Sequence, residues 1–199
     1  LGFALSLCLF GTNIANADDT LIRVGLLVPL TGSATEQGQW IDAGLRMGAE
    51  RFEAEHHKRI QIDLEETAAD PKKAITAYRA LKAKDASDVP LRVVFTYGSG
   101  VALALSPITN DDKVIQMGLA TSTPAYRSLG DYTFRNFPSA ELESAFLAAK
   151  IIKHAPSKKI AIVRIQNEYG AGTAKSFRAA FEANGGSITF EDELEPGGT

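Results

Sequence analysis

The sequence predicts an α/β protein in which buried parallel strands alternate with helices in two successive lobes. Nearly continuous apolar runs recur along the chain, and such runs are typical of strands that are covered on both faces of a parallel sheet. Most runs are followed by a short polar loop and then by apolar residues at helical spacing, which is the pattern of β-α units. The pattern breaks at Pro138 and starts again from Glu141, so we expect a first lobe in residues 18–138 and the start of a second in residues 139–199.

The stretch from Ile22 to Gly48 holds the first strand, loop and helix. Apolar residues dominate from Ile22 to Leu30, and a helix is predicted from about Gln37 to Glu55. The apolar residues at helical spacing are Ile41, Leu45, Gly48 and Phe52. We expect Leu45 and Gly48 to face the sheet, with the glycine allowing a close approach.

The loop of residues 31–38 is the first place where we expect a ligand contact. In open α/β sheets, ligands bind outside the carboxyl ends of the strands. The alternative is a polar connection between strand and helix that binds nothing.

A second strand is predicted from Ile60 to Leu64, followed by a helix that begins at Asp70 and Pro71. Aspartate is a favoured N-cap and proline suits the first helical position, so this pair has an adequate structural explanation. The helix is predicted to bury Ala74, Ile75, Tyr78 and Leu81.

The third strand, residues 91–95, leads into Gly98, Ser99 and Gly100, and a helix follows from about Val101. Free backbone N–H groups and the helix dipole at such a position suit an anionic group such as a carboxylate, and Ser99 adds a hydroxyl. The alternative is a serine that only caps the helix.

The fourth strand, Val114 to Leu119, ends in Ala120, Thr121 and Ser122. These hydroxyls could satisfy only the backbone of the turn. However, the small polar loops of three parallel strands lie at one edge of the predicted sheet, so we treat them as one candidate binding cluster.

The second lobe repeats the alternation and is expected to be incomplete in this chain, because the sequence stops in a loop at 194–199. Its predicted elements are a helix at 141–154, an apolar strand at 160–165, a loop at 166–170, a helix at 173–184 and a strand from Ile188.

The N-terminus resembles the end of a secretory signal peptide. Residues 1–10 are apolar but too short to span a bilayer, and the small-residue pattern Ala15-Asn16-Ala17 follows. We expect cleavage after Ala17 and a periplasmic location. The single cysteine, Cys8, lies in this segment, and the leucine directly before it disfavours a lipid anchor.

Composition and motifs argue against several classes of function. The formal net charge is −3, which gives no reason to expect nucleic acid or an anionic membrane surface as a partner. The phosphate-binding loop and the hydrolase elbow are absent from the sequence, and Leu103 replaces the third glycine of a dinucleotide motif. His56 and His57 are adjacent and would point apart on a helix end. We therefore expect a protein without catalytic residues, cofactor or metal.

The order and spacing of these segments resemble the type I periplasmic binding proteins, most nearly the branched-chain amino-acid (leucine/isoleucine/valine) binding family of ABC transporters. The segments that carry the resemblance are the signal peptide, IRVGLLVPLTG with GQWIDAGLRMGAERFEAE, the Asp70-Pro71 helix start, YGSG, LATSTPAYRSLGDYTFRNFPS and KKIAIVRIQNEYGAGTAKSFRAAFEANGG. They cover essentially all of the mature chain. The resemblance implies two lobes, each a parallel sheet flanked by helices, that close on a ligand held between them, and a membrane permease as partner.

The same resemblance implies a set of ligand contacts. Ser99 and Ser122, with the backbone of Ala120, would bind a carboxylate, and Tyr169 would cover the ligand on closure. Gln37 stands at a first-loop position that is often aromatic in amino-acid binders, so the chain departs from the family pattern there.

We expect a small carboxylate-bearing ligand, first of all an amino acid. The acid that usually pairs with the amino group in this family would lie beyond Thr199. Amides, urea-like compounds and aromatic acids remain alternatives, and so does a sensor role in which the same fold feeds a receptor or signalling partner.

Overall fold

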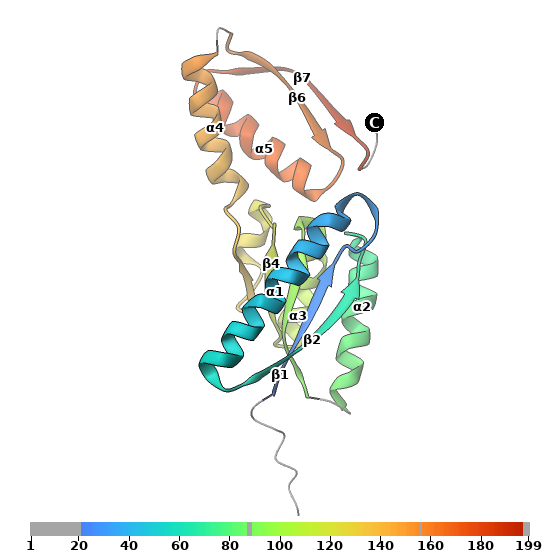
Figure 1. Ribbon diagram of the computed structural model, residues 1–199. Coiled ribbons are helices and arrows are strands. Elements are labelled where there is room, and N and C mark those ends of the chain that lie inside the picture. The colour runs from blue at the N-terminus through green and yellow to red at the C-terminus, as the bar shows by residue number, and fades with distance from the viewer. Residues whose placement is uncertain (1–20, 87–88, 156, 197–199) are drawn as a thin grey trace, which may run out of the picture.

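The computed structural model describes residues 21–86, 89–155 and 157–196, which form two α/β lobes (Figure 1). The first lobe contains strands β1 to β5 and helices α1 to α3, and the second contains β6, β7, α4 and α5. Residues 136–139 connect β5 to α4 and so join the lobes. The predicted signal peptide, residues 1–17, lies outside the described residues.

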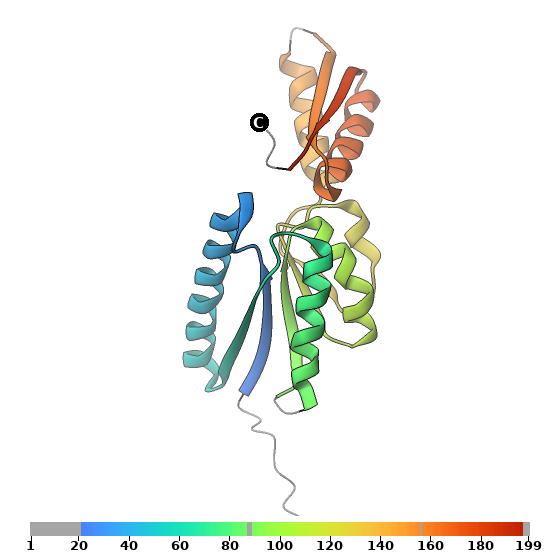
Figure 2. The same cartoon turned by 90° about the vertical axis from the view of Figure 1, so that its right-hand side faces the viewer.

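The first lobe is a five-stranded parallel sheet in the order β2-β1-β3-β4-β5. Its strands are β1 (Leu21–Val28), β2 (Arg59–Glu66), β3 (Leu91–Tyr97), β4 (Ile115–Leu119) and β5 (Thr133–Arg135). Its helices are α1 (Thr35–His56), α2 (Pro71–Ala83) and α3 (Ser99–Asp111), with 3-10 turns at Gly32–Ala34, Lys84–Ala86 and Pro124–Ser128. Figure 2 shows α1 on one face of the sheet and α2 and α3 on the other. The predicted α/β class with a parallel sheet is confirmed.

The core lies between the sheet and the pair α2 and α3. Leu26, Leu27 and Val28 are fully buried, as expected for a strand covered on both faces. The stripe predicted on α2 is also confirmed, because Ala74, Tyr78 and Leu81 are buried and Ile75 packs against them. Further core residues come from β3, α3 and the residue before β4: Leu91, Val94, Val101, Leu105 and Val114.

The expectation for Gly48 is wrong. Gly48 is exposed, and a Cβ added there would meet nothing within 4 Å, whereas Leu45 is half-buried. After Leu45 the inward stripe continues four residues later at Ala49, which turns Gly48 outward. The glycine that allows close approach is Gly38, where a Cβ would lie 1.7 Å from the carbonyl oxygen of Pro29.

The second lobe is a parallel pair of strands covered on one face. Its elements are α4 (Ala140–His154), β6 (Lys159–Ile165), α5 (Glu168–Ala183) and β7 (Ser187–Leu194). Ile160 and Ile162 pack against α4 and α5, whereas Val163 on the opposite face is 60% exposed. The apolar run of β6 therefore forms a strand, but only one of its faces is covered in the described residues. None of the helices in the described parts of the chain is both long and apolar enough to cross a membrane.

The start of α5 also differs from the expectation. The sequence predicts a loop at 166–170 and a helix from Thr173, but the helix begins at Glu168. Asn167 is its N-cap, and its Oδ1 accepts a hydrogen bond from the amide of Gly170 at 2.8 Å. The glycines of this segment suggest a loop, but the cap and packing keep them helical. Tyr169 consequently lies in the first turn of a helix.

Candidate functional site

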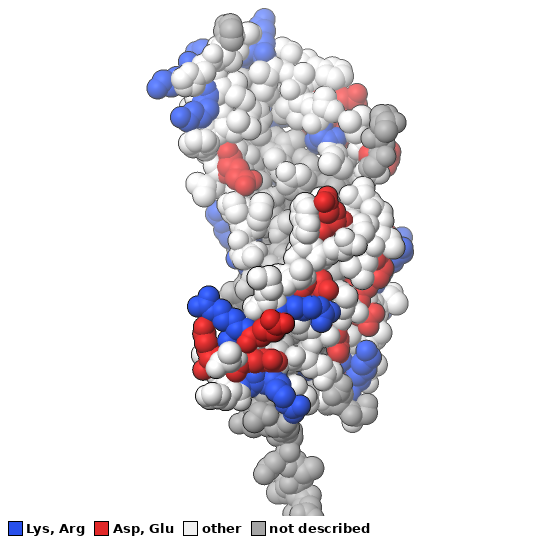
Figure 3. Space-filling model, in the orientation of Figure 1, with Lys and Arg blue, Asp and Glu red and all other residues white. Residues whose placement is uncertain are grey.

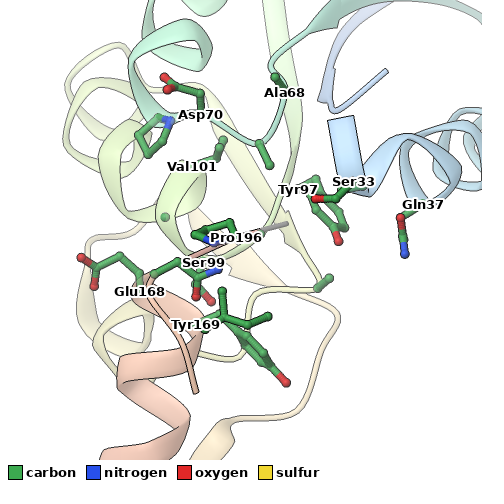
Figure 4. A pocket seen from close by; sticks show the side chains of 18 of the residues that line it. Ser33, Gln37, Ala68, Asp70, Tyr97, Ser99, Val101, Glu168, Tyr169 and Pro196 are labelled. Carbon is green, nitrogen blue, oxygen red and sulfur yellow. The ribbon is translucent and has the colours of Figure 1, made fainter. Parts of the chain in front are cut away.

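A cavity of about 770 Å³ lies between the two lobes, at the carboxyl ends of the strands of the first sheet. Figure 3 shows the hollow between the lobes, and Figure 4 shows the side chains that line it. The first lobe contributes Ser33, Ala34, Gln37, Ala68, Ala69, Asp70, Pro71, Tyr97, Gly98, Ser99, Gly100, Val101 and Ala120. The connection and the second lobe contribute Phe137, Glu143, Ile165, Asn167, Glu168, Tyr169 and Pro196.

Ser99 stands at the junction of β3 and α3 and is 2% exposed. The alternative that Ser99 only caps the helix is wrong, because Gly98 occupies the N-cap position and Ser99 is the first helical residue. Ser99 Oγ accepts a hydrogen bond from the amide of Thr123 at 3.4 Å, so its own proton remains available to a ligand. Gly98 donates its amide to the carbonyl of Leu119 at 2.9 Å, which ties the ends of β3 and β4 together.

One residue of the loop after β4 lies in the wall of the cavity, and the next two lie in the interior of the lobe. Ala120 lines the cavity. Thr121 and Ser122 are fully buried and do not line it. The hydroxyl of Thr121 donates to the carbonyl of Leu119 at 3.1 Å and so serves the turn. The hydroxyl of Ser122 is buried and has no hydrogen-bond partner among the described residues, which is unusual for a buried polar group.

Three alanines that line the cavity have left-handed backbones: Ala68 at φ 50°, Ala69 at φ 57° and Ala120 at φ 47°. Such conformations are uncommon for residues other than glycine and cost about 1–3 kcal/mol each. They persist only where surrounding contacts fix them, and they cluster at binding sites. Sequence analysis did not single out Ala68 and Ala69, because an alanine gives no sign of positive φ.

The carboxylate of Glu66 fixes two of the loops that border the cavity. Glu66 Oε2 accepts from the amide of Leu30 at 2.5 Å, and Oε1 accepts from the amide of Ala68. The amide of Thr67 donates to the carbonyl of Val28 at 3.0 Å. The loops after β1 and β2 are thus tied to each other by a charged acceptor, which makes a stronger hydrogen bond than a neutral one.

Gln37 and Tyr169 face the cavity from different lobes (Figure 4). Gln37 Oε1 is buried and has no hydrogen-bond partner among the described residues. Tyr169 is 44% exposed in the first turn of α5. Burial, and then the neighbouring Tyr169, raises the pKa of Tyr97 above its usual range, so Tyr97 is a neutral hydrogen-bond donor at neutral pH. Tyr97 directly precedes the glycine turn, which is a signal that could have identified it.

The charges around the cavity come from carboxylates and helix ends. Its residues include Asp70, Glu143 and Glu168, whereas none of the described residues that line it is Lys, Arg or His. Asp70 is occupied as the N-cap of α2, because its Oδ1 accepts from the amides of Lys72 at 2.7 Å and Lys73 at 2.9 Å. The hydrogen bond from Lys73, supported by that from Lys72, holds the pKa of Asp70 below its usual value.

The amino-terminal turns of four helices also border the cavity, namely α1, α2, α3 and α5. Each of these helix ends carries a partial positive charge. In α2 the amides of Lys72 and Lys73 already donate to Asp70, whereas the first turn of α3 has no side-chain cap. The cavity can therefore hold a small ligand that has an anionic group, with further polar or cationic groups toward the acids. In the described residues, His, Cys, Asp and Glu do not form a group of three or more that could hold a metal.

Of the residues predicted from the sequence, the structure brings Gln37, Ser99, Ala120 and Tyr169 together around one cavity. Thr121 and Ser122 lie behind its wall. Ser33 and Gln37 also confirm that the loop of residues 31–38 borders the cavity. The polar and aromatic lining residues that the sequence did not assign to a site are Asp70, Tyr97, Phe137, Glu143, Asn167 and Glu168.

Comparisons with known proteins identify the family. A family profile described as periplasmic binding protein matches residues 21–199. The Leu/Ile/Val-binding protein BraC3 of Rhizobium johnstonii is 26% identical over 188 residues, which cover 92% of this chain and 49% of that protein. The Leu/Ile/Val-binding protein of Escherichia coli is 23% identical over 190 residues, covering 94% and 50%.

Solved structures have the same fold. A leucine binding protein from Thermotoga maritima matches with a TM-score of 0.75 at 18% identity, covering 88% of this chain and 49% of that one. A solute binding protein of an ABC transporter from Rhodopseudomonas palustris, in complex with 3,4-dihydroxy benzoic acid, matches with a TM-score of 0.77 at 23% identity, covering 89% and 48%.

The chain spans about half the length of the curated relatives that it matches. The family profile, however, covers nearly all of the chain, including both lobes and the cavity between them. The resemblance in the sequence to the type I, branched-chain amino-acid branch is confirmed by the family profile and these relatives, and the solved structures share its fold. The chain belongs to the periplasmic binding protein family.

Proposed function

We propose that this protein is the extracytoplasmic solute-binding subunit of an ABC importer and that it binds a small α-amino acid between its lobes. The observation that carries the proposal is the convergence of four helix N-termini and the Ser99 hydroxyl on one cavity between the lobes. In this function the protein captures, holds and releases its ligand, and no bond of the ligand is made or broken.

The carboxylate of the ligand binds at the ends of β3 and β4. Ser99 offers a hydroxyl proton, and the first turn of α3 offers free amides. Ser122 supplies a second hydroxyl when the loop after β4 adjusts to the ligand, and its buried, unpartnered oxygen supports that role. The left-handed Ala120 turns its backbone at the same place. A carboxylate held by several such donors needs no lysine or arginine.

The amino group of the ligand lies toward Glu143 and Glu168. Both acids line the cavity, and the side-chain carboxylate of neither forms an ion pair or hydrogen bond with another described residue. A ligand that was only an anion would meet these negative charges without a basic side chain to compensate. A zwitterion satisfies both the helix N-termini and the acids, so the charges favour an α-amino acid. The names of the relatives, which are Leu/Ile/Val-binding proteins, agree with this choice.

An aromatic acid is the second candidate. Tyr97, Phe137 and Tyr169 give the cavity three aromatic side chains. Solute binding proteins with the same fold have been solved with benzoate and with 3,4-dihydroxy benzoic acid. In this case the carboxylate keeps its position and the ring stacks between the tyrosines.

The partner in this function is a membrane permease, and the location is the periplasm. Lobes of this kind close around a ligand by hinge motion, and the permease reads the closed form. Tyr169 on α5 is well placed to cover the ligand as the lobes close.

A thermal-shift screen of the protein expressed from its complete gene tests the proposal. The panel contains branched-chain and other α-amino acids, their amides, and benzoates. A ligand at about a hundred times its dissociation constant stabilises the folded protein by about 2.7 kcal/mol. A shift with leucine-like amino acids supports the proposal. A shift with benzoates alone supports the aromatic-acid candidate, and no shift with any compound rejects both.

A further inference from the structure

The two lobes touch where α5 meets the loop that follows β4. Gly172 lies in the second turn of α5, and a Cβ placed there would lie 3.1 Å from Thr123 Oγ1 and 3.5 Å from Pro124 Cδ. A second contact lies nearby, where a Cβ on Gly100 would be 3.8 Å from Glu168 Cγ. At Gly172, the bare backbone of a second-lobe helix rests directly on the first lobe.

The other glycine of this segment has a different explanation. A Cβ on Gly170 would lie 2.0 Å from the carbonyl oxygen of Ile165, which belongs to the same lobe, so Gly170 is required by the local β-α turn. Gly172 has no such neighbour in its own lobe, because its nearest atoms belong to Thr123 and Pro124. Glycine inside a helix costs about 1 kcal/mol relative to alanine. At position 172, the close contact with Thr123 and Pro124 of the first lobe explains why the residue is a glycine.

This contact is connected to the ligand cavity on both sides. In the first lobe, Thr123 donates its amide to Ser99 Oγ at 3.4 Å. In the second lobe, Tyr169 lies on the same helix, three residues before Gly172, and faces the cavity. The distance between α5 and the Thr123 loop therefore sets the distance across the cavity between Tyr169 and Ser99.

We propose that Gly172 is a positioning residue that sets how closely the second lobe approaches the ligand-binding wall of the first. A side chain at position 172 holds α5 away from Thr123 and Pro124, and the lobes then close less completely. The effect on affinity rests on the proposed function. The effect on the separation of the lobes does not depend on it.

The test compares Gly172→Ala and Gly172→Leu with a matched control, Gly44→Ala. Gly44 lies on α1, and a Cβ there would meet nothing within 4 Å. In the control, the better helix former raises the melting temperature by about 2–4 °C and leaves ligand affinity unchanged. In Gly172→Ala, we expect a melting temperature that does not fall and a dissociation constant that rises about fivefold or more. Gly172→Leu should show a larger loss.

The separation of the lobes is measured without ligand. Spin labels are attached to cysteines introduced at two exposed positions, Glu50 on α1 and Lys175 on α5, in a Cys8→Ser background. The distance between the labels should increase from wild type to Gly172→Ala to Gly172→Leu and stay constant in Gly44→Ala. An increase in a protein that binds no tested ligand supports the role of Gly172 and rejects the proposed function.

A double variant provides the rescue. Thr123→Ala removes the hydroxyl that lies closest to the added Cβ. The loss of affinity caused by Gly172→Ala should therefore be much smaller when the change is made in the Thr123→Ala protein than when it is made in the wild type. Unchanged label distances in both Gly172 variants would overturn the inference. The inference would also be overturned if the melting temperature fell together with the affinity in the Gly172 variants. It would be overturned equally if the double variant recovered none of the lost affinity.

Discussion

Ser99 Oγ accepts a hydrogen bond from the amide of Thr123 at 3.4 Å. This bond joins the first turn of α3 to the loop after β4, and with it two of the strand ends that border the cavity. The oxygen only accepts in this bond, so the hydroxyl proton remains available to a ligand. In the proposed function, this part of the wall is therefore ordered before a ligand arrives, which reduces the cost of ordering it on binding.

Replacing Ser122 with alanine should weaken ligand binding by about 1–3 kcal/mol, since a buried charged group would then lack one donor. The stability of the ligand-free protein should not fall, because the hydroxyl has no partner among the described residues. Titration calorimetry and thermal unfolding measure the two quantities. Ser106→Ala is a suitable control, since Ser106 is also fully buried but donates to the carbonyl of Leu103 within its own helix. An unchanged affinity in Ser122→Ala would remove Ser122 from the site.

Replacing Glu66 with alanine should reduce both the free energy of unfolding and ligand affinity. The carboxylate accepts from the amides of Leu30 and Ala68, and hydrogen bonds to charged groups contribute about 1.5–3 kcal/mol each. Denaturant unfolding should show a loss of at least about 2 kcal/mol, with a smaller loss in Glu66→Gln, whose amide keeps one acceptor oxygen. Glu65→Ala, one residue earlier, serves as the control. Equal stabilities of the Glu66 and Glu65 variants would show that the two loops do not depend on this carboxylate.

Much of the fold could be predicted from the sequence because the buried residues follow simple sequence patterns. The run from Leu26 to Val28 is fully buried, and Asp70 and Pro71 begin α2 with the predicted cap. Such features depend on neighbouring residues alone. Whether Gly48 faces the sheet could not be predicted in the same way, because this depends on how α1 is rotated about its axis against the sheet. A shift of the inward stripe by one residue moves a side chain from the buried face of the helix to the exposed face.

The candidate site was predicted in part for the same reason. Parallel strands place their carboxyl ends together, so Ser99 and Ala120 could be assigned to one edge before the structure was known. The contribution of Glu143 could not, because it depends on how the second lobe sits on the first. The helical start of α5, which carries Tyr169, was missed because the glycines around it suggest a loop.

Replacing Tyr169 with alanine should weaken ligand binding by more than about 1 kcal/mol, as expected for an aromatic side chain that covers a ligand. Its stability should change little, since the residue is 44% exposed. Phe134, which is 50% exposed on β5 and does not line the cavity, is a matched aromatic control. Calorimetry on both alanine variants should show a loss of ligand affinity in Tyr169→Ala and none in Phe134→Ala. Equal affinities would mean that α5 does not cover the ligand.

At the opposite end of the first sheet, Arg23 is fully buried. Its Nε donates to Asp63 Oδ2 at 2.6 Å and its Nη1 donates to Asp85 Oδ1 at 3.0 Å. Burial disfavours the charged form of Asp85, but hydrogen bonds from Lys82 and from the amide of Leu91 outweigh burial and hold the pKa of Asp85 below its usual value. A carboxyl whose pKa is lower in the folded than in the unfolded chain stabilises the fold above the unfolded pKa of about 4, and this stabilisation is lost as the pH falls through the folded pKa.

Asp85→Asn should therefore lower the free energy of unfolding at pH 7 and lower it less at pH 3, because the wild type loses the charged interaction on acidification and the variant has none to lose. Urea unfolding at the two pH values measures this difference. Asp111→Asn, at the exposed end of α3, is the control for an aspartate-to-asparagine change at a surface position. If the cost of Asp85→Asn were equal at pH 7 and pH 3, the charge of Asp85 would not contribute to folding, and the hydrogen bonds to Arg23 and Leu91 would be sustained by a neutral side chain equally well.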